Sequence, residues 1–181
     1  MSHIPQINIA NTTGSHRALF DQINGAFGTV PNMFTTIGNS EAALESMWGS
    51  FGALGKGSLA PKLGEQIAVL VADINRCEYC LAAHTALGQK AGASSEEMAN
   101  AQAGKSDDAK TQAALDFTIA VVNKRAGVSK DEIENLKKAG FTNEGVTEIL
   151  AHIALNIFTN YTNVAFDVPV DFPKVALRSA V

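Results

Sequence analysis

Both cysteines of the 181-residue chain lie in one segment, residues 65–84, which reads EQIAVLVADINRCEYCLAAH. Cys77 and Cys80 are three residues apart, and His84 follows four residues after Cys80. If residues 77–91 form a helix, these three side chains lie in a row, because positions i, i+3 and i+7 share one helix face. Any fold that this chain adopts must therefore place two thiols and an imidazole together.

The start of this helix bears on which thiol is activated. Asn75 and Glu78 fit the N-cap and N3 positions, so we expect the helix to begin just before Cys77. The positive end of the helix dipole then favours the thiolate form of Cys77. A base one turn away favours Cys80 instead, because only Cys80 is four residues from His84. We give the histidine more weight, because the reaction of a thiolate with an oxidised substrate also needs a group that delivers a proton to the oxygen that leaves.

Glu65 is the second informative residue. Its helix is apolar on every side over residues 67–72, which is typical of a helix that is packed all round. A glutamate is almost never fully buried unless it is paired. One interpretation is that Glu65 reaches solvent or stabilises the helix N-terminus. The other is that it meets His84, holds the imidazole in place and raises its basicity, and the neighbouring thiols favour this second interpretation.

Charge and hydropathy narrow the class of protein. The formal net charge is −4 and no cluster of Lys or Arg is present, which argues against a nucleic-acid binder. The longest uncharged apolar run, residues 67–72, is too short to span a bilayer, and the N-terminus does not read as a signal peptide. We therefore expect a cytoplasmic protein, in which two closely spaced cysteines are typical of catalysis or metal binding.

The chain has no segment of sustained period-two alternation and no hairpin signal, so we expect an all-α fold, a compact bundle of seven or eight helices. Cap and glycine signals predict helices over residues 15–27, 40–54, 61–74, 77–91, 106–127, 129–140 and 142–166. They also predict a short helix that begins at residue 94 or 95. We expect one domain, residues 1–181, made of an N-terminal helical extension (1–58), a core (59–166) and an irregular tail (167–181).

Four kinds of chemistry fit the set of Glu65, Cys77, Cys80 and His84 to different degrees. A c-type haem site needs a histidine directly after the second cysteine, where this chain has Leu81. A zinc site fits poorly, because a helical Cys-x-x-Cys does not usually close a tetrahedron. Two plain core cysteines would require both to fall at this spacing by chance. We favour a redox-active dithiol, in which one thiolate attacks an oxidised substrate and the other closes a disulfide.

The pattern of Glu65, CEYC at residues 77–80 and His84 resembles the active-site set of the AhpD-like alkylhydroperoxidases, within the carboxymuconolactone decarboxylase family. The resemblance covers residues 59–92. Residues 28–34 and 152–163 resemble the peroxidase-related branch of that family. The family's proteins are all-helical trimers or hexamers, so the resemblance implies an AhpD-like bundle that forms a homo-oligomer.

The resemblance also implies roles. Cys80 would be the peroxidatic cysteine and Cys77 the resolving one, while Glu65 and His84 would form a proton relay that deprotonates Cys80 and protonates the departing alcohol. The implied activity is reduction of organic hydroperoxides without a cofactor or metal, with a dithiol reductant that is of lipoyl type in the best-known members. Alternatives are a thiol-disulfide oxidoreductase with little peroxide activity and a non-enzymatic redox sensor.

One position departs from the family pattern. The well-characterised AhpD proteins carry a second histidine just before the second cysteine, where this chain has Tyr79. The decarboxylases that give the family its name lack the cysteine pair, so we do not expect lactone decarboxylation.

Polar residues recur along one face of the last predicted helix, namely His152, Asn156, Asn160 and Asn163. They either line the active site or a wet subunit interface, or form a buried network that satisfies helix ends and loops. We favour the network. A group of Met and aromatic side chains could roof a pocket, but such groups are more often plain core, and we interpret this one as core. Its members are Met33, Phe34, Met47, Trp48 and Phe51.

Overall fold

A computed structural model describes residues 2–178, and over that range the regular elements are helices without any strand. The predicted all-α class is therefore confirmed. A 3-10 turn at Ile9–Asn11 precedes the α-helices, which are α1 (Gly14–Phe27), α2 (Asn32–Ile37), α3 (Glu41–Leu54), α4 (Pro61–Ile74), α5 (Glu78–Lys90), α6 (Ser95–Gln102), α7 (Ala109–Asn123), α8 (Lys130–Lys138) and α9 (Asn143–Ala165).

The helix that the sequence did not predict is α2, so the described part has one more α-helix than the upper expected count. It is only six residues long, too short for a helical period to show in the sequence. It begins directly after Pro31, and its residues from Met33 to Ile37 are buried. Gly38 ends it at a place where a Cβ atom would lie 2.4 Å from the Phe20 ring and 2.7 Å from the Phe34 carbonyl oxygen.

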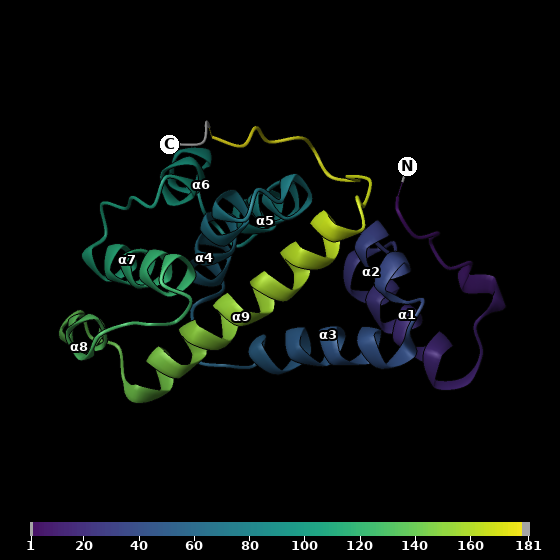
Figure 1. Ribbon diagram of the computed structural model, residues 1–181, viewed down its shortest axis with the longest axis horizontal. Coiled ribbons are helices and arrows are strands. Elements are labelled where there is room, and N and C mark those ends of the chain that lie inside the picture. The colour runs from purple at the N-terminus through teal and green to yellow at the C-terminus, as the bar shows by residue number, and fades with distance from the viewer. Residues whose placement is uncertain (1, 179–181) are drawn as a thin grey trace.

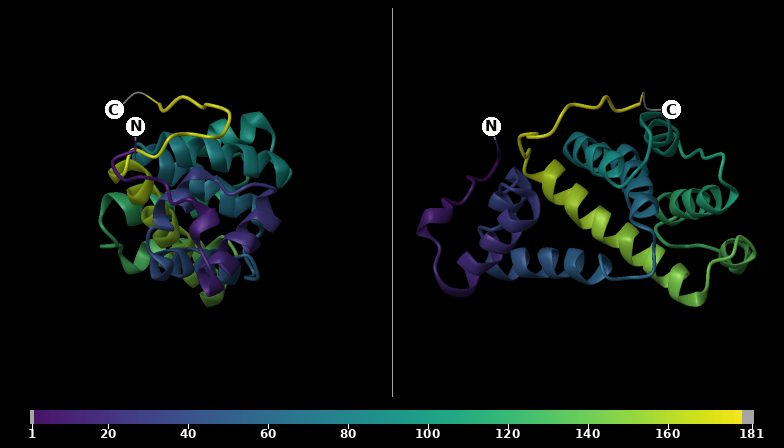
Figure 2. Two further views of the ribbon diagram at one scale, coloured as in Figure 1. Left: turned by 90° about the vertical axis from the view of Figure 1, so that its right-hand side faces the viewer. Right: turned by 180° about the vertical axis from the view of Figure 1, so that it is seen from behind.

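The longest helix, α9, runs diagonally across the molecule and connects its two ends (Figure 1). Helices α1–α3 lie at one end and α6–α8 at the other, while α4 and α5 lie between them (Figures 1 and 2). Helix α4 packs against α5, α6, α7 and α9. It is therefore the central helix of the bundle, and it carries Glu65.

The apolar run of α4 explains this central position, because it supplies both parts of the core. Leu63, Ile67 and Val71 recur at i, i+4 and i+8 and pack into a cluster with α7, α8 and the first half of α9. Val69 and Leu70 pack into a second cluster, which also contains the two thiols and side chains of α1–α3. Each fully buried aliphatic side chain contributes about 1.5–3 kcal/mol, so the two clusters hold α4 firmly on both sides.

The connection between α4 and α5 differs from the prediction at one residue. Asn75 does not cap α5, because it closes α4 with φ −82° and ψ 3°, whereas an N-cap needs an extended backbone. Arg76 follows in the left-handed region at φ 58°. The N–H of Arg76 donates to the Asp73 carbonyl at 3.2 Å and that of Cys77 to the Ala72 carbonyl at 2.9 Å, which is the hydrogen-bond pattern of a Schellman motif.

The N-cap of α5 is therefore Cys77 itself, which has the extended conformation that a cap requires (φ −92°, ψ 93°). Its sulfur accepts the N–H of Cys80 at 3.2 Å. A sharp turn with Arg76 in the left-handed region thus ends one helix and starts the next within three residues. It fixes Cys77 at the corner between them.

The tail after Pro169 has no regular structure as far as residue 178, in agreement with the prediction; residues 179–181 lie outside the described residues. It runs along the outside of α5 towards α6 (Figure 1). Asp171 accepts the N–H of Asn32 at 2.7 Å, and Arg178 forms an ion pair with the buried Asp73 at 3.2 Å. The tail is therefore tied at both ends. Within the described residues, no helix is long and apolar enough to cross a membrane.

Candidate active site

The two cysteines lie at the start of α5 and are both buried, with exposed fractions of 1% for Cys77 and 2% for Cys80. Both are free thiols. Cys80 is in the first turn of the helix and His84 is one turn further along the same face, also buried. The structure thus brings Cys80 close to His84 as the spacing predicted, while Cys77 lies beside Cys80 as the N-cap and not on the helix face.

Glu65 reaches this row from α4. Its Oε2 lies 2.7 Å from Nδ1 of His84, so the predicted contact between carboxylate and imidazole is present. The side chain of Glu65 is 24% exposed, compared with 11% for that of His84, so the carboxylate is paired and also reaches the surface. Burial lowers the pKa of His84, but the charge and hydrogen bond of Glu65 and the charge of Cys80 outweigh it and raise the pKa. Glu65 therefore favours the imidazolium form, and its bond to Nδ1 leaves Nε2 available.

The electrostatics distinguish the two thiols. Burial raises the pKa of Cys80, but the hydrogen bond with Cys77, the charge of His84 and the amide of Asn163 outweigh it and lower the pKa to about 7. The same hydrogen bond with Cys80, together with burial, raises the pKa of Cys77 far above its ordinary value. The environment thus favours the thiolate at Cys80. The helix dipole alone had favoured Cys77, whereas the position of His84 had favoured Cys80.

Helix α9 completes the surroundings of Cys80. The side-chain amide of Asn163 donates to the Cys80 sulfur at 3.1 Å, and the hydroxyl of Thr159 lies 3.9 Å from it. The hydroxyl of Thr159 donates in turn to the backbone carbonyl of Asn156 at 3.0 Å, which fixes its orientation. One donor thus points directly at the sulfur on which we expect negative charge.

The polar row of α9 is therefore more than the structural network that we favoured from sequence. Asn160 fits that interpretation through its carbonyl oxygen, which accepts from the amide of Asn75 at 3.1 Å, although its side chain also helps to lower the pKa of Cys80. Asn163 does not, because it contacts Cys80. His152 and Asn156 line a cavity beside Glu65. In the sequence, Asn163 could be singled out only as a member of the polar row of the last helix, whereas nothing in the sequence indicated Thr159 as a site residue.

A narrow apolar cavity of about 40 Å³ lies against Cys80 and His84. The Met and aromatic group that we interpreted as core does belong to the hydrophobic cluster, but three of its members also line this cavity, namely Met33, Phe34 and Phe51. A water molecule needs about 10–15 Å³ of such space, so this cavity admits a small group and not a bulky molecule.

Tyr79, which departs from the family pattern, forms part of the cavity wall. Its hydroxyl accepts the backbone N–H of Met33 at 3.2 Å, and its ring packs edge-on against Phe172 of the tail, with the ring centroids 5.7 Å apart. Burial raises the pKa of its phenol, which therefore stays neutral. Tyr79 thus joins α2, α5 and the tail, and it offers no proton-transfer group at neutral pH.

A second cavity, of about 170 Å³, lies on the other side of His84 and is lined by Glu65, His152 and Asn156. Burial lowers the pKa of His152, although the charges of Glu148 and Glu65 oppose the change. The carboxylate of Glu148 accepts the backbone N–H groups of Ser58 and Leu59 at 2.8 and 2.9 Å, so it anchors the loop that precedes α4. His84 thus lines both the apolar cavity at the thiol and a larger cavity of mixed lining at the carboxylate.

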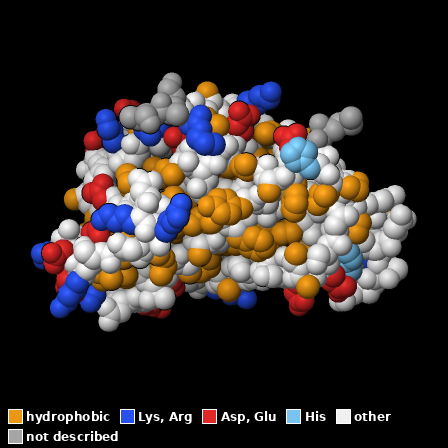
Figure 3. Space-filling model, viewed as in Figure 1, with side chains coloured by type: hydrophobic (Ala, Val, Ile, Leu, Met, Phe, Trp, Pro, Cys, Tyr) orange, Lys and Arg blue, Asp and Glu red, His pale blue; other side chains and the backbone are white. Residues whose placement is uncertain are grey.

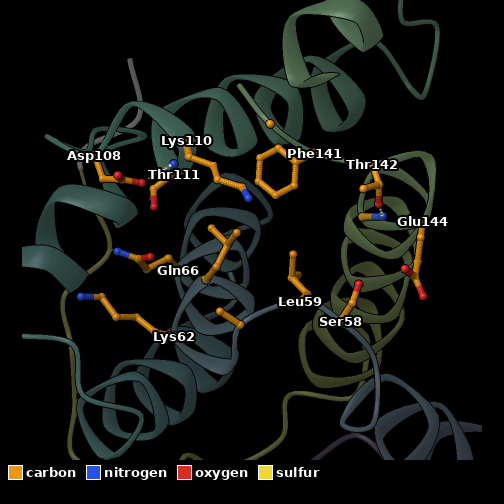
Figure 4. Close-up of a pocket in the computed structure, with 14 residues that line it drawn as sticks. Ser58, Leu59, Lys62, Gln66, Asp108, Lys110, Thr111, Phe141, Thr142 and Glu144 are labelled. Atoms are coloured by element: carbon orange, nitrogen blue, oxygen red, sulfur yellow. Dashed lines mark hydrogen bonds between the residues drawn. The ribbon is translucent and has the colours of Figure 1, made fainter. Parts of the chain in front are cut away.

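A further pocket, of about 470 Å³, lies away from the thiols between α4, α7 and α9 (Figure 4). Lys110 points across it towards the ring of Phe141, with its ammonium 4.7 Å from the ring centroid. None of its lining residues is a cysteine or a histidine. Among residues 2–178 no group of three or more His, Cys, Asp or Glu side chains is arranged to hold a metal ion.

Residues 41–123, which include α4 and the cysteine helix, match the model of the carboxymuconolactone decarboxylase family. The chain also has the fold of a peroxidase-related protein from Ralstonia eutropha, described as an alkylhydroperoxidase AhpD core, with a TM-score of 0.85 and 23% identity over 94% of this chain and 92% of that one. Residues 41–123 are thus similar to the carboxymuconolactone decarboxylase family, and the described chain has the AhpD-like fold.

Two other solved structures show how widely this AhpD-like fold is used. A peroxidase-related protein from a Silicibacter species has a TM-score of 0.81 at 22% identity, over 93% of this chain and 91% of that one. The debrominase Bmp8, solved in complex with 2,3,4-tribromopyrrole, has a TM-score of 0.77 at 21% identity, over 92% and 90%. No curated protein sequence matches the chain significantly. A debrominase and two uncharacterized peroxidase-related proteins thus share the fold.

Proposed function

We propose that this AhpD-like protein is a cytoplasmic thiol peroxidase that reduces organic hydroperoxides. The observation that carries the proposal is the setting of Cys80, whose pKa is lowered to about 7 at the wall of an apolar cavity. The pairing of His84 with Glu65 at 2.7 Å supports it, because it places a proton donor and acceptor one helical turn from the thiol. A reactive thiol in an apolar cavity suits a substrate with a hydroperoxide group on a hydrocarbon.

The reaction takes place in two steps. The Cys80 thiolate attacks the terminal peroxide oxygen, the O–O bond breaks, and the alkoxide leaves as an alcohol after receiving a proton from His84, whose charge Glu65 stabilises. Cys80 is then a sulfenic acid. The Cys77 thiol attacks it, a disulfide forms and water leaves. The hydroperoxide is thus reduced by two electrons, which come from the two thiols.

The size of the cavity sets the expected substrate range. About 40 Å³ holds the peroxide group and a few carbon atoms, and larger hydroperoxides require the aromatic wall to move. Phe172 is the wall residue that the irregular tail contributes, and it is only partly buried. We infer that small hydroperoxides react faster than large ones.

We also propose that the chain forms a homo-oligomer, either a trimer or a hexamer. Figure 3 shows a band of hydrophobic surface across the face on which α9 lies. Large apolar side chains on the outer face of α9 are 38–61% exposed, and a contiguous apolar patch of this kind marks an interaction site. These side chains are Leu150, Phe158, Tyr161 and Val164.

The experiment that tests the peroxidase is a single turnover. Reduced protein is mixed with ethyl hydroperoxide, a small substrate that suits the cavity, and with the larger cumene hydroperoxide for comparison; thiols are counted over time, and Cys77→Ser and Cys80→Ser are treated in parallel. We expect rapid loss of two thiols in the parent and a sulfenic acid trapped only in Cys77→Ser. If the thiols survive the peroxide but react with a small disulfide, the protein is a disulfide reductase instead. Oxidation without turnover in the presence of a dithiol reductant would indicate a redox sensor.

The aromatic lining of the Cys80 cavity favours one second candidate, reductive removal of bromide from a small aromatic ring. The debrominase Bmp8 shares the fold, and Phe34, Phe51 and Phe172 offer faces and edges to a flat ring that enters once this aromatic wall moves, because the cavity of about 40 Å³ is too small for the ring. In this reaction the carbon–bromine bond is replaced by a carbon–hydrogen bond, bromide leaves, and the two thiols supply two electrons as they form a disulfide. Bromide release from 2,3,4-tribromopyrrole, measured with the reduced protein, distinguishes this activity from peroxide reduction.

A further inference from the structure

The pocket of about 470 Å³ that lies away from the thiols is the place where three helices begin (Figure 4). The N-cap residues of α4, α7 and α9 all line it, and these are Ala60, Asp108 and Thr142. The positive ends of three helix dipoles therefore lie at one cavity, which favours a negatively charged group inside it. Its volume is within the range of about 300–1,000 Å³ that is typical of small-molecule sites.

The start of α4 differs from the starts of the other two helices. In α7 and α9 the side chain of the N-cap residue accepts a backbone N–H of the first turn, at 2.7 and 3.2 Å respectively. The N-cap of α4 is Ala60, whose side chain cannot accept a hydrogen bond. The backbone N–H groups of Lys62 and Leu63 have no acceptor in the described part of the chain, and both residues line the pocket. An oxyanion at this helix start supplies the acceptor that the sequence does not.

The side chain of Gln66, one turn further along α4, is the second and independent sign of a ligand. Gln66 lines the pocket and is only 3% exposed, yet its amide has no hydrogen-bond partner among residues 2–178. Figure 4 shows the amide pointing towards the space between Lys62 and Thr111. Buried polar groups are hydrogen-bonded with few exceptions, so this amide indicates that a group in the pocket bonds to it.

Lys110 supplies a positive charge for the ligand. It forms no ion pair within residues 2–178, and its ammonium lies 4.7 Å from the centroid of the Phe141 ring, in the middle of the pocket (Figure 4). The other charged residues of the lining are engaged or peripheral. Lys62 is paired with an acid of α6, Asp108 caps α7, and Glu144 lies at the edge of the pocket in Figure 4. Lys110 is therefore the charge that can bind an anion.

We propose that this pocket binds a small organic oxyanion, which has a phosphate or carboxylate head on an apolar body. The head lies against Lys110 and the uncapped start of α4, and Gln66 donates a hydrogen bond to it. The body lies on the apolar part of the lining, which consists of Leu59, Leu63 and the ring of Phe141. The site uses neither thiol, so it is a second function beside the proposed peroxidase.

The first test asks whether both parts of the ligand are needed. Calorimetric titration of the whole protein compares phenyl phosphate and benzoate, which carry a head and a body, with two partial probes. Inorganic phosphate is a head alone, and benzyl alcohol is an aromatic body without charge. We expect phenyl phosphate or benzoate to bind about tenfold more tightly than either partial probe, and the tighter of the two identifies the head. Equal binding of a partial probe, or no binding of any probe, would overturn the proposal.

The second test locates the bound probe. Lys110→Met removes the ammonium and keeps the length of the side chain. Lys105→Met is the matched control, because it removes the charge of another exposed lysine that does not line the pocket. The affinity for the tighter probe should fall about tenfold in Lys110→Met and change by less than about twofold in Lys105→Met. Equal loss in both variants would show a general effect of net charge and would refute the site.

The third test separates binding from folding. Gln66→Leu keeps the approximate size of the side chain and removes an amide that has no partner within the described residues. The free variant should therefore unfold at the same temperature as the parent or higher, while it binds the probe more weakly. A lower unfolding temperature with unchanged binding would show that the amide is structural and would contradict the proposal. Binding is measured without turnover, so the result does not depend on peroxidase activity.

Discussion

Replacement of Asn163 by leucine tests the electrostatic setting of Cys80, because it removes the amide that donates to the sulfur at 3.1 Å. The Asn163 amide lies 3.1 Å from Cys80 Sγ, while its carbonyl oxygen is buried without a hydrogen-bond partner among the described residues. Leucine has a similar size and removes both the donor and the unsatisfied acceptor. We therefore expect Asn163→Leu to fold with nearly unchanged stability and to raise the pKa of Cys80.

The magnitude follows from the strength of a hydrogen bond to a charged group, about 1.5–3 kcal/mol. One pKa unit corresponds to about 1.4 kcal/mol, so the pKa of Cys80 should rise by about one to two units from its value of about 7. At pH 7 the thiolate fraction then falls from about one half to between about one tenth and one hundredth. Alkylation of Cys80 at pH 7 should slow by about five- to fifty-fold, with little change above pH 10.

The measurement is the rate of iodoacetamide alkylation between pH 5 and pH 10 in a Cys77→Ser background, where only Cys80 reacts and the serine hydroxyl can still donate to it. The matched control is Asn156→Leu on the same helix, because the Asn156 amide donates to the His152 carbonyl at 2.9 Å and not to a thiol. A profile of Asn163→Leu that superimposes on the parent, or an equal shift in both variants, would refute the reasoning.

Two further predictions use the acidic groups of α4. Glu65→Gln should lower the pKa of His84, since Glu65 raises it, and should shift the alkylation profile of Cys80 to higher pH; an unchanged profile would exclude Glu65 from the base system. Burial raises the pKa of Asp73, but the Gln102 amide and the N–H groups of Arg178 outweigh it, so its pKa is lowered in the folded protein. Its stabilisation is therefore complete above the unfolded value of about 4 and is lost as the pH falls through the folded value. Thermal unfolding of Asp73→Asn should occur below that of the parent at pH 7, and the gap should narrow as the pH falls below about 4; a gap that stays constant through that range would contradict this account.

The parts of the site that the sequence predicted are those that depend on local periodicity. Cys80 and His84 are neighbours because they are one turn apart on one helix, and any helical assignment places them together. The contact of Glu65 with His84 was predictable for a different reason, since a carboxylate in an apolar helix needs a partner and the imidazole lies on the next helix. The helices with clear caps, such as α8 with its capping box, were predictable on the same local grounds.

The parts that the sequence did not predict depend on how distant segments meet. Asn163 is 83 residues from Cys80, and only the crossing of α9 over α5 brings its amide to the sulfur. The cap of α5 moved from Asn75 to Cys77 because α4 continues through Ile74, and a residue that closes one helix does not have the extended backbone that starts another. The anchoring of the tail through Phe172 on Tyr79 has no periodic signal either.

The cap at Cys77 explains how two cysteines only three residues apart acquire opposite properties. Cys77 is the last residue of the turn between the helices, so its N–H closes α4 and its sulfur caps α5. It also lines an open pocket of about 380 Å³ that does not include Cys80. Cys80 is inside the first turn, so its N–H donates to Cys77 while its sulfur meets Asn163 and the charge of His84. The left-handed conformation of Arg76 contributes by placing Cys77 outside the helix, where its sulfur meets the N–H of Cys80. The hydrogen bond between the two cysteines then raises the pKa of Cys77 and, together with the charge of His84, lowers the pKa of Cys80 against the effect of burial. A change that straightened this turn would move the Cys77 sulfur from its capping position, and the difference between the two pKa values should decrease.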